Sequence, residues 1–356
     1  MASELFPLVV VEGTPGERGY RHGAEARERV ARSVDIHRRA IRLYGGLEWS
    51  AAAERAAAYL PILREYAPEM VEELRGIAEG AGLPFADILT LNTRYELTFT
   101  PRLAGGCTSF AVLPEASANG HTYLGQNWDN LFALVDACLV LKVVQAPGPS
   151  YLTVTEAGVP AMVGLNAAGI GIARNALIVA GGDGRPGVTM NATHYRVLNA
   201  QRFGDALGAV VAARLGSPLC YVIGAPGEAL ALEAAPPLSD YVHDDAGILT
   251  HANHFESPRL HVEDLGKAAL PDSLFRARRL RRTLEARRGS LDVPAIFAAL
   301  SDHFNYPNSL CRHPDERDAA DGRWGTVCTA VMDLDDRVLH LSDAQPCGGH
   351  HRAIPL

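Results

Sequence analysis

The chain has 356 residues, a hydrophobic content of 47%, a charged content of 21% and a formal net charge of −8. The first three values describe an ordinary globular protein that can bury a sizeable core. The negative net charge gives no reason to expect a nucleic acid or an anionic membrane as partner. The six cysteines are scattered without a Cys-x-x-Cys pair, a pattern that argues against a disulfide scaffold and a structural zinc site.

The hydropathy pattern points to no membrane association. No run approaches the ~20 apolar residues of a membrane span, and the first residues lack the basic and apolar regions of a secretory signal. We therefore expect a cytoplasmic protein without a membrane partner.

The first hundred residues are predicted to be mostly helical. After a strand within residues 1–12, helical periodicity begins near Glu17, near Ser50 and at Pro68, and a short helix leads into residues 91–96. Glycines follow the first and third of these patterns, where helix ends commonly fall.

From Cys107 onwards the pattern changes to short β-like segments separated by glycine-containing turns. Helices are predicted at 194–201, 203–215 and 293–302. Strands are predicted at 110–113, 121–126, 138–144, 151–156, 161–165, 170–173, 176–179, 219–224, 229–234, 326–334 and 338–342, the last two forming a hairpin. This order favours one domain of layered antiparallel sheets with helices outside them.

An arginine-rich segment over 276–288 is predicted to form an amphipathic helix. Its arginines are expected on a solvated face, with Leu274, Leu280 and Leu284 buried.

The strongest candidate for chemistry is Cys107, which follows Gly105-Gly106 at the start of a strand-like segment. Glycine leaves the carbonyl before the cysteine open to attack and permits unusual backbone angles. Our hypothesis is that the chain is cut between Gly106 and Cys107. The new N-terminus would then carry a thiol as nucleophile and an α-amine, with a pKa of about 8, as base.

Asp129 and Asn253 are candidates to assist Cys107. Asp129 follows a strand and could orient the new amine, although an Asx turn is an alternative interpretation. Asn253 lies in the sequence His251-Ala252-Asn253-His254 and could donate its amide N–H to a developing oxyanion. The pair His251 and His254 also suggests a metal site, but no partner pair with zinc-like spacing accompanies it.

Three further residues are weaker candidates. Asn175 could be a second amide donor or a turn residue between strands. Arg312 and Arg323 could bind a substrate carboxylate or lie near the catalytic carboxylate, with a surface position as the alternative.

Motifs along nearly the whole chain resemble the acyl-coenzyme A:isopenicillin N acyltransferase (penicillin acyltransferase) family of autoproteolytic N-terminal nucleophile hydrolases. The matching segments are Gly105-Gly106-Cys107-Thr108, Gly125-Gln126-Asn127-Trp128-Asp129, Gly19-Tyr20-Arg21-His22-Gly23, residues 74–81, 91–94, 155–158, 164–166, 175–177, 251–254, 270–273 and 305–307.

The resemblance implies an α+β fold, a four-layer αββα sandwich, with self-cleavage between Gly106 and Cys107. Residues 1–106 would form a helical α chain and residues 107–356 a β chain, together one structural domain. It further implies Cys107 as nucleophile, Asp129 facing the freed amine and Asn253 as oxyanion donor. Thr108, Asn175, Arg312 and Arg323 would bind substrate or support the site, the last by its match to an active-site arginine of the family.

The sequence thus predicts a self-processing cysteine acyltransferase or amidohydrolase that acts through an acyl-cysteine. Its expected partners are a small-molecule amide, an acyl-amino acid or acyl-coenzyme A as substrate, and its own two chains; a homo-oligomer is left open. No cofactor and no catalytic metal are expected. The alternatives are a metal-dependent amidohydrolase using His251 and His254, and a noncatalytic binding protein of the same fold.

Overall fold

The computed structural model describes residues 5–97, 106–180 and 185–356, which cluster into two compact units. Unit 1 comprises the described residues of 1–103, 136–168 and 181–217, and unit 2 those of 104–135, 169–180 and 218–356. Gly105 of the predicted cleavage motif lies outside the described residues. Within the described ranges, no helix is long and apolar enough to cross a membrane.

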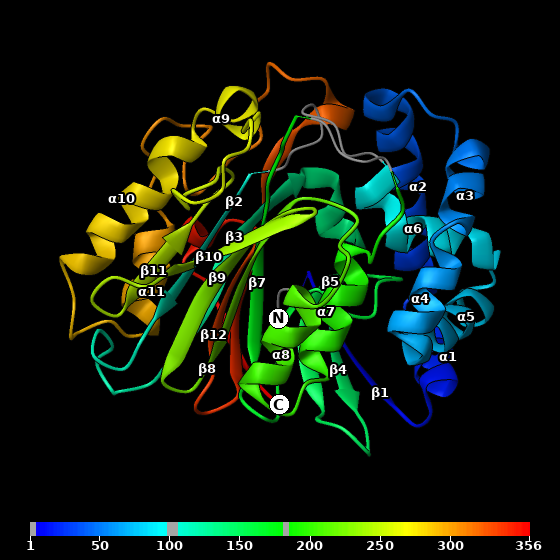
Figure 1. Cartoon of the computed structure of the whole chain (residues 1–356), viewed down its shortest axis with the longest axis horizontal. Helices are drawn as coiled ribbons and strands as arrows, with labels where there is room; N and C mark the ends of the chain where they lie inside the picture. Colours follow the sequence, from blue (N-terminus) through cyan, green and yellow to red (C-terminus); the bar gives the residue numbers. More distant parts are fainter. Residues whose placement is uncertain (1–4, 98–105, 181–184) are drawn as a thin grey trace. The chain divides into compact units, whose positions relative to one another are not determined.

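Unit 1 is dominated by helices, as predicted for the first hundred residues; those of its N-terminal part are blue to cyan in Figure 1. The helices are α1 (Pro15–Glu25), α2 (Arg27–Gly45), α3 (Trp49–Ala57), α4 (Leu60–Tyr66), α5 (Pro68–Ala81), α6 (Phe85–Leu97), α7 (Met190–Leu198) and α8 (Phe203–Val211). Its strands, β1 (Leu8–Glu12), β4 (Cys138–Val144), β5 (Tyr151–Glu156) and β6 (Val163–Asn166), follow the order β1-β4-β5-β6. The helices predicted from Glu17 and from Ser50 are each divided in two.

Helices α1 and α5 pack through glycines, so that their backbones approach closely. A Cβ atom on Gly19 would lie 2.0 Å from the Glu73 carbonyl oxygen, and one on Gly76 would lie 2.2 Å from the Gly16 carbonyl oxygen. Gly23 and Gly80 show the same geometry one turn further along. These glycines belong to two of the segments that carry the family resemblance, and close helix contact is the physical reason for them.

Unit 2 contains two groups of strands and two longer helices. Its helices are α9 (Gly266–Ala269), α10 (Ser273–Glu285) and α11 (Val293–Leu300), with short 3-10 helices η2 (Ala320–Gly322) and η3 (Pro346–Gly348). Its strands are β2 (Cys107–Val112), β3 (Tyr123–Leu131), β7 (Gly171–Ala176), β8 (Leu219–Ala225), β9 (Glu228–Ala235), β10 (Leu238–His243), β11 (Ile248–His251), β12 (Trp324–Asp333), β13 (Val338–Asp343) and β14 (Arg352–Pro355). The 3-10 helix η1 (Phe132–Ala137) follows β3 in the chain.

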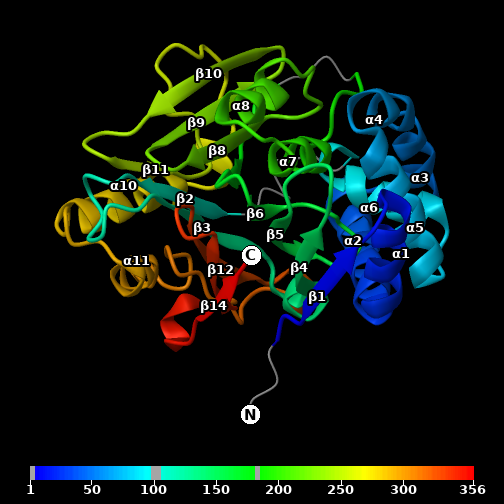
Figure 2. The same ribbon diagram turned by 90° about the horizontal axis from the view of Figure 1, so that it is seen from below.

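The strands of unit 2 form the six-stranded sheet β11-β2-β3-β12-β13-β14 and the run β7-β8-β9-β10. In Figure 2, α10 and α11 lie together on one side of the six-stranded sheet. Strands β7 and β8 pack against β2 and β3. This helix–sheet–sheet layering buries every residue of β2, so that this strand lacks the polar alternation of a half-exposed strand. The predicted α+β class is confirmed.

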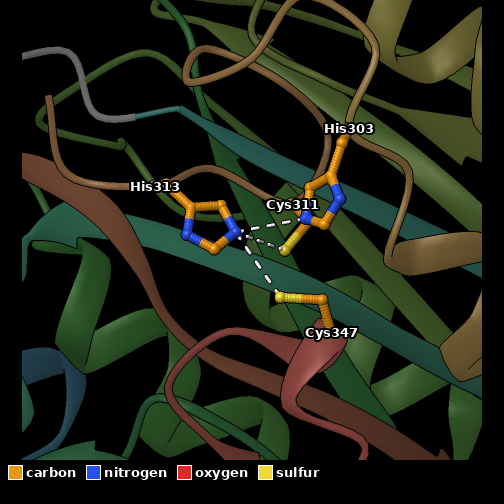
Figure 3. Close-up of side chains that lie close together, drawn as sticks. All are labelled: His303, Cys311, His313 and Cys347. Atoms are coloured by element: carbon orange, nitrogen blue, oxygen red, sulfur yellow. Dashed lines mark hydrogen bonds between the residues drawn. The ribbon is translucent and has the colours of Figure 1, made fainter.

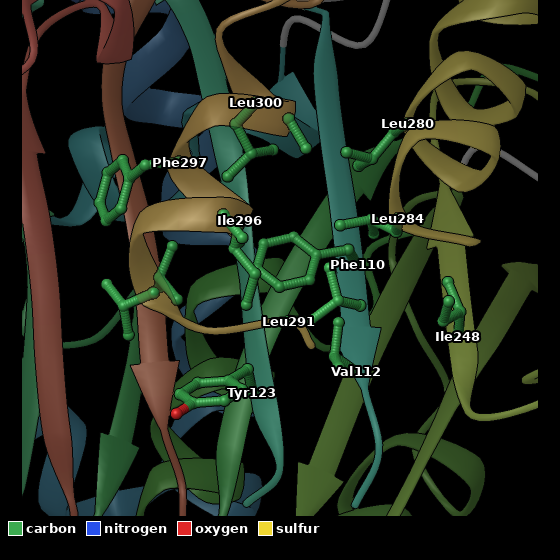
Figure 4. Packing of buried hydrophobic residues seen from close by; sticks show 14 of the residues in the cluster. Phe110, Val112, Tyr123, Ile248, Leu280, Leu284, Leu291, Ile296, Phe297 and Leu300 are labelled. Carbon is green, nitrogen blue, oxygen red and sulfur yellow. The ribbon is translucent and has the colours of Figure 1, made fainter. Parts of the chain in front are cut away.

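The core of unit 2 fills the space between its helices and the six-stranded sheet (Figure 4). Phe110 and Val112 of β2 are fully buried there, together with Ile296 and Leu300 of α11. This packing fixes the position of β2, and with it the position of Cys107 at its first residue.

Several sequence predictions need correction. Leu274 is 48% exposed, whereas Arg276 on the same helix is fully buried. Residues 176–179 form no separate strand, because β7 ends at Ala176 and the chain then makes an isolated bridge at Val179. Strands β10 and β14 had no clear signal, since both are short edge strands with largely exposed residues.

The glycine contact between α1 and α5 yields a stability prediction. Gly76→Ala should lower the free energy of unfolding by about 1–3 kcal/mol, because its methyl group collides with backbone. The control is Gly208→Ala in α8, where a Cβ meets nothing within 4 Å. This change should instead raise stability by up to about 1 kcal/mol through helix propensity. Equal effects of the two substitutions in urea unfolding would contradict the close-packing explanation.

Candidate active site

Cys107 is the first residue of β2 and is 2% exposed. Strand β3 pairs with β2 on one side and places Trp128 opposite Cys107. Strand β11 pairs on the other side, with His251 opposite Ser109, so the chain beyond β11 passes close to Cys107. This neighbouring segment contains Asn253.

Asn253 holds the backbone nitrogen of Cys107. The Cys107 N–H donates to Asn253 Oδ1 at 2.8 Å, and Asn253 Nδ2 donates to the carbonyl oxygen of Ala176 at 3.0 Å. The backbone N–H of Asn253 donates a hydrogen bond to Ser273 Oγ at 2.7 Å. An amide NH₂ group has two hydrogens, so the bond to Ala176 leaves one for another acceptor.

Arg276 connects both sides of the Cys107 backbone. Its Nη1 donates to the Cys107 carbonyl oxygen at 2.7 Å and to Thr108 Oγ1 at 2.6 Å. Its Nη2 donates to Asn253 Oδ1 at 2.8 Å, and its Nε donates to Asp272 Oδ2 at 2.7 Å. The arginine-rich pattern predicted Arg276 on a solvated face, and this prediction was wrong. Its spacing of four residues from both Asp272 and buried Leu280 is the signal that could have revealed its position.

Asp129 lies on β3 and is held by groups from later in the chain. Thr326 Oγ1 donates to Asp129 Oδ1 at 2.8 Å, and Arg312 Nε lies 3.5 Å from Asp129 Oδ2. Strand β12 places Thr326 opposite Asp129 of β3, and the register of the two strands shifts between Thr326 and Cys328. Burial raises the pKa of Asp129 to about 6, although Arg312 and Arg276 favour its charged form.

Asp272 balances the two arginines. Its Oδ2 accepts from Arg276 Nε at 2.7 Å and from Arg312 Nη2 at 2.5 Å. Burial alone would raise the pKa of Asp272, but the two guanidinium groups more than offset it and lower this pKa. The site therefore contains two arginines and two aspartates in mutual contact.

Gly106 sits directly among these charged groups. A Cβ atom there would lie 3.2 Å from Arg312 Nη2 and from Asp129 Oδ2, and 3.3 Å from Arg276 Nη2. Glycine thus keeps the peptide bond before Cys107 next to one carboxylate and two guanidinium groups.

The thiol of Cys107 is not activated in the intact chain. Burial raises its pKa to about 11, and the nearby Arg174 offsets this only in part. Its Sγ lies 3.9 Å from the carbonyl oxygen of Asp129. A base is therefore required before this sulfur can attack a carbonyl near neutral pH.

Asn175 lies on the same side of β2 as the Cys107 side chain. Residues two apart on a strand share a face, and Ser109 Oγ donates a hydrogen bond to Asn175 Oδ1. Asn175 Nδ2 is buried and has no hydrogen-bond partner among the described residues. A buried amide donor without an acceptor is costly and fits a group that awaits a ligand oxygen.

The two arginine candidates, Arg312 and Arg323, have different partners. Arg323 donates to the carbonyl oxygens of Asp318 and Glu316 in its own loop, and it is Arg312 that contacts the site carboxylates. Among the described residues Arg323 contacts its own loop, and its assignment to the site stays a prediction. Arg323 comes just before β12 in sequence, and this position does not determine the direction of its long side chain.

The two histidines of the metal alternative are engaged in hydrogen bonds. His251 Nε2 lies 2.8 Å from Glu233 Oε1, its Nδ1 lies 2.8 Å from the Ala252 carbonyl oxygen, and His254 Nδ1 lies 2.8 Å from Ser273 Oγ. Burial opposes the charged form of His251, but its partners raise its pKa well above the ordinary value. Neither histidine belongs to a group of three or more potential metal ligands in the described part of the chain.

Arg276 should be essential to the stability of this site. Arg276→Ala removes the buried donor to the Cys107 carbonyl oxygen and leaves Asp272 with Arg312 as its one remaining arginine partner, so we expect a loss of about 3–5 kcal/mol in the free energy of unfolding. Arg282→Ala, an exposed arginine on the same helix, is the matched control and should change stability by less than about 0.5 kcal/mol. Urea unfolding of both variants tests this, and a loss below 1 kcal/mol for Arg276→Ala contradicts it.

The sequence also matches known proteins. The family model for acyl-coenzyme A:6-aminopenicillanic acid acyl-transferase matches residues 116–347, a range that begins after Cys107 and includes Asp129, Asn253, Arg276 and Arg312. A curated relative from Emericella nidulans, the 40 kDa form of acyl-coenzyme A:6-aminopenicillanic-acid-acyltransferase, is 30% identical over 339 residues, 91% of this chain and 89% of its own. An uncharacterized protein from Archaeoglobus fulgidus is 25% identical over 362 residues, 85% of this chain and 58% of its own.

Among solved structures, a variant of the conjugated bile acid hydrolase from Clostridium perfringens is 15% identical with a TM-score of 0.49, covering 70% of this chain and 92% of its own. The penicillin V acylase from Agrobacterium tumefaciens is 14% identical with a TM-score of 0.43, covering 67% of this chain and 83% of its own. By the family-model match and the 30% identity across nearly its whole length, the protein belongs to the acyl-coenzyme A:6-aminopenicillanic acid acyl-transferase family and is an enzyme of the acyltransferase and amide hydrolase type.

Proposed function

We propose that the protein is a self-processing acyltransferase or amide hydrolase whose nucleophile is Cys107 at a newly created N-terminus. The observation that carries the proposal is the convergence of Asn253, Arg276, Asp129 and Arg312 on the Gly106–Cys107 peptide. These residues come from distant parts of the chain, and a structural cysteine has no need of them.

Processing would use the thiol of Cys107 against the carbonyl carbon of Gly106. A carbon–sulfur bond forms, the Gly106–Cys107 carbon–nitrogen bond breaks, and the thiol proton passes to the departing nitrogen. Water then hydrolyses the thioester, which restores the thiol and leaves a carboxylate on Gly106. Asp129 Oδ2, which has no hydrogen-bond partner among the described residues, is close enough to Gly106 to relay a proton in this step.

Turnover would depend on the amine that cleavage creates. A free α-amine has a pKa of about 8, and a thiol beside it can transfer its proton to that amine. Asn253 Oδ1 already accepts a hydrogen bond from this nitrogen, so it is suited to hold the amine in place. The sulfur then attacks an acyl carbonyl, the leaving group takes up the proton, and water or an amine removes the acyl group from sulfur.

The oxyanion of this reaction needs an N–H donor. Asn253 was expected to be that donor; its oxygen faces Cys107, and one of its two amide hydrogens is used by Ala176. Asn175 Nδ2 is the better-supported candidate, because it is buried beside β2 without an acceptor. A fixed donor of this type contributes roughly 2.7–4 kcal/mol to transition-state stabilisation.

The substrate class follows from family membership. The relative from Emericella nidulans is named for acyl transfer between acyl-coenzyme A and 6-aminopenicillanic acid. We propose an acyl-coenzyme A thioester or an acylated amine as acyl donor for this chain, with residues 1–106 and 107–356 remaining associated as its two chains. No step of this mechanism calls on His251 or His254.

The cleavage site can be tested by intact mass spectrometry. The purified protein should give two fragments, 1–106 and 107–356, and Cys107→Ala should give one uncut, inactive chain. Cys138→Ala, a buried cysteine of β4, is the control and should still be cut. Cleavage of Cys107→Ala between residues 106 and 107 would exclude the mechanism, and an uncut wild-type chain after prolonged incubation would favour a noncatalytic binding protein.

The role of Asn175 can be separated from that of processing. Asn175→Ala should still yield both fragments, while kcat for thiol release from a panel of acyl-coenzyme A thioesters falls by a factor on the order of 10² to 10³. KM should change far less, because the donor acts mainly in the transition state. A processed variant with an unchanged kcat on thioesters that the wild type cleaves would remove Asn175 from the reaction.

A further inference from the structure

Four side chains of unit 2 whose chemical types can ligate a metal lie together (Figure 3). They are His303, Cys311, His313 and Cys347, and their ligand atoms all lie within 4.8 Å of one another. His313 Nε2 is 3.1 Å from His303 Nε2 and 3.5 Å from the sulfur atoms of both cysteines. No sequence motif predicts this group, because its two cysteines are 36 positions apart in the printed sequence.

These separations match the edges of a tetrahedral site. Zinc lies about 2.3 Å from sulfur and about 2.0–2.1 Å from nitrogen, which places two nitrogens about 3.3 Å apart and nitrogen and sulfur about 3.6 Å apart. The observed 3.1 and 3.5 Å are within about 0.2 Å of these values. Two cysteines with two histidines are a common ligand set of structural zinc sites.

The backbone around the cluster is held in place without an ion. The N–H of Cys311 donates to the Asp302 carbonyl oxygen, and the N–H of His313 donates to the Pro307 carbonyl oxygen, both at 3.0 Å. Cys347 is positioned by η3, which packs against α11. Cys311 is buried, while His303 and Cys347 are exposed. An ion can therefore reach the cluster from solvent on the side of His303 and Cys347.

We propose that His303, Cys311, His313 and Cys347 bind one Zn²⁺ ion in a closed, structural site. Zn²⁺ forms two bonds to sulfur and two to nitrogen, and the two thiols lose their protons to solvent. With all four positions filled by protein, the ion has no open position for substrate or water. Its role is to tie η3 to the loop before β12.

This loop carries Arg312 of the active site. Cys311 and His313 flank Arg312, and neighbouring side chains of an extended chain point to opposite sides. The Arg312 guanidinium accordingly contacts Asp272 and Asp129, while its two neighbours face the cluster. A bound ion would therefore fix the segment that positions Arg312 without touching the reacting atoms.

The proposal is tested on the full-length protein, purified under reducing conditions, stripped with a chelator and titrated with Zn²⁺ and with Co²⁺ as a spectroscopic probe. We expect one Zn²⁺ per chain, a rise in Tm on zinc addition, and the thiolate charge-transfer and visible bands of tetrahedral Co²⁺. His303→Ala and Cys347→Ser, both at exposed positions, should each weaken Zn²⁺ binding by at least about 100-fold.

His350→Ala is the matched control, because this exposed histidine lies three residues after Cys347 and outside the cluster. It should bind Zn²⁺ as the wild type does. The proposal is overturned if the wild type binds no zinc, or if His303→Ala and Cys347→Ser bind it unchanged. Zinc binding lost in Cys107→Ala and kept in Cys347→Ser would place the ion at the nucleophile and equally overturn the proposal.

Discussion

The buried guanidinium group of Arg276 is the interaction on which the site depends. It donates to the Cys107 carbonyl oxygen, to Thr108 and to Asn253, and is paired with Asp272. Burying a charge lowers the free energy of unfolding unless the charge is paired and hydrogen-bonded. The guanidinium group of Arg276 therefore requires these partners, and they depend on it in turn. These contacts hold the site in position in the intact chain.

The charges around Gly106 explain how one arrangement could serve two reactions. Arg276 and Arg312 supply two positive charges, and Asp272 with Asp129 balances them when Asp129 is ionised. Burial places the pKa of Asp129 at about 6, so that this carboxylate can exchange a proton near neutral pH. The thiol with its pKa of about 11 stays protonated until a base is available. A cut chain supplies this base as an amine, and an uncut chain does not.

Arg312 links this site to the rest of unit 2. Two hydrogen bonds join its backbone to Thr326. The Arg312 N–H donates to Thr326 Oγ1, and the Thr326 N–H donates to the Arg312 carbonyl oxygen. Thr326 in turn holds Asp129. The cluster of His303, Cys311, His313 and Cys347 adjoins the same segment. A substrate site and a stabilising site would then share one short stretch of chain. Their effects can be measured separately, because the first acts on turnover through the reacting atoms and the second acts on stability without contacting those atoms.

The sequence by itself determined the helical first hundred residues, most strands after Cys107 and the α+β class, because periodicity and glycine placement are local signals. It also singled out Cys107, Asp129 and Asn253, which the fold brings to one place. Tertiary structure alone decided that Arg276 is buried, that Arg323 contacts its own loop and that Cys347 meets His303, Cys311 and His313. The physical reason is that the position of a long charged side chain or of a single metal ligand depends on its partners in space. Such a partner can be 100 or more residues away in sequence, as Cys107 is from Arg276, and local sequence patterns do not reveal it.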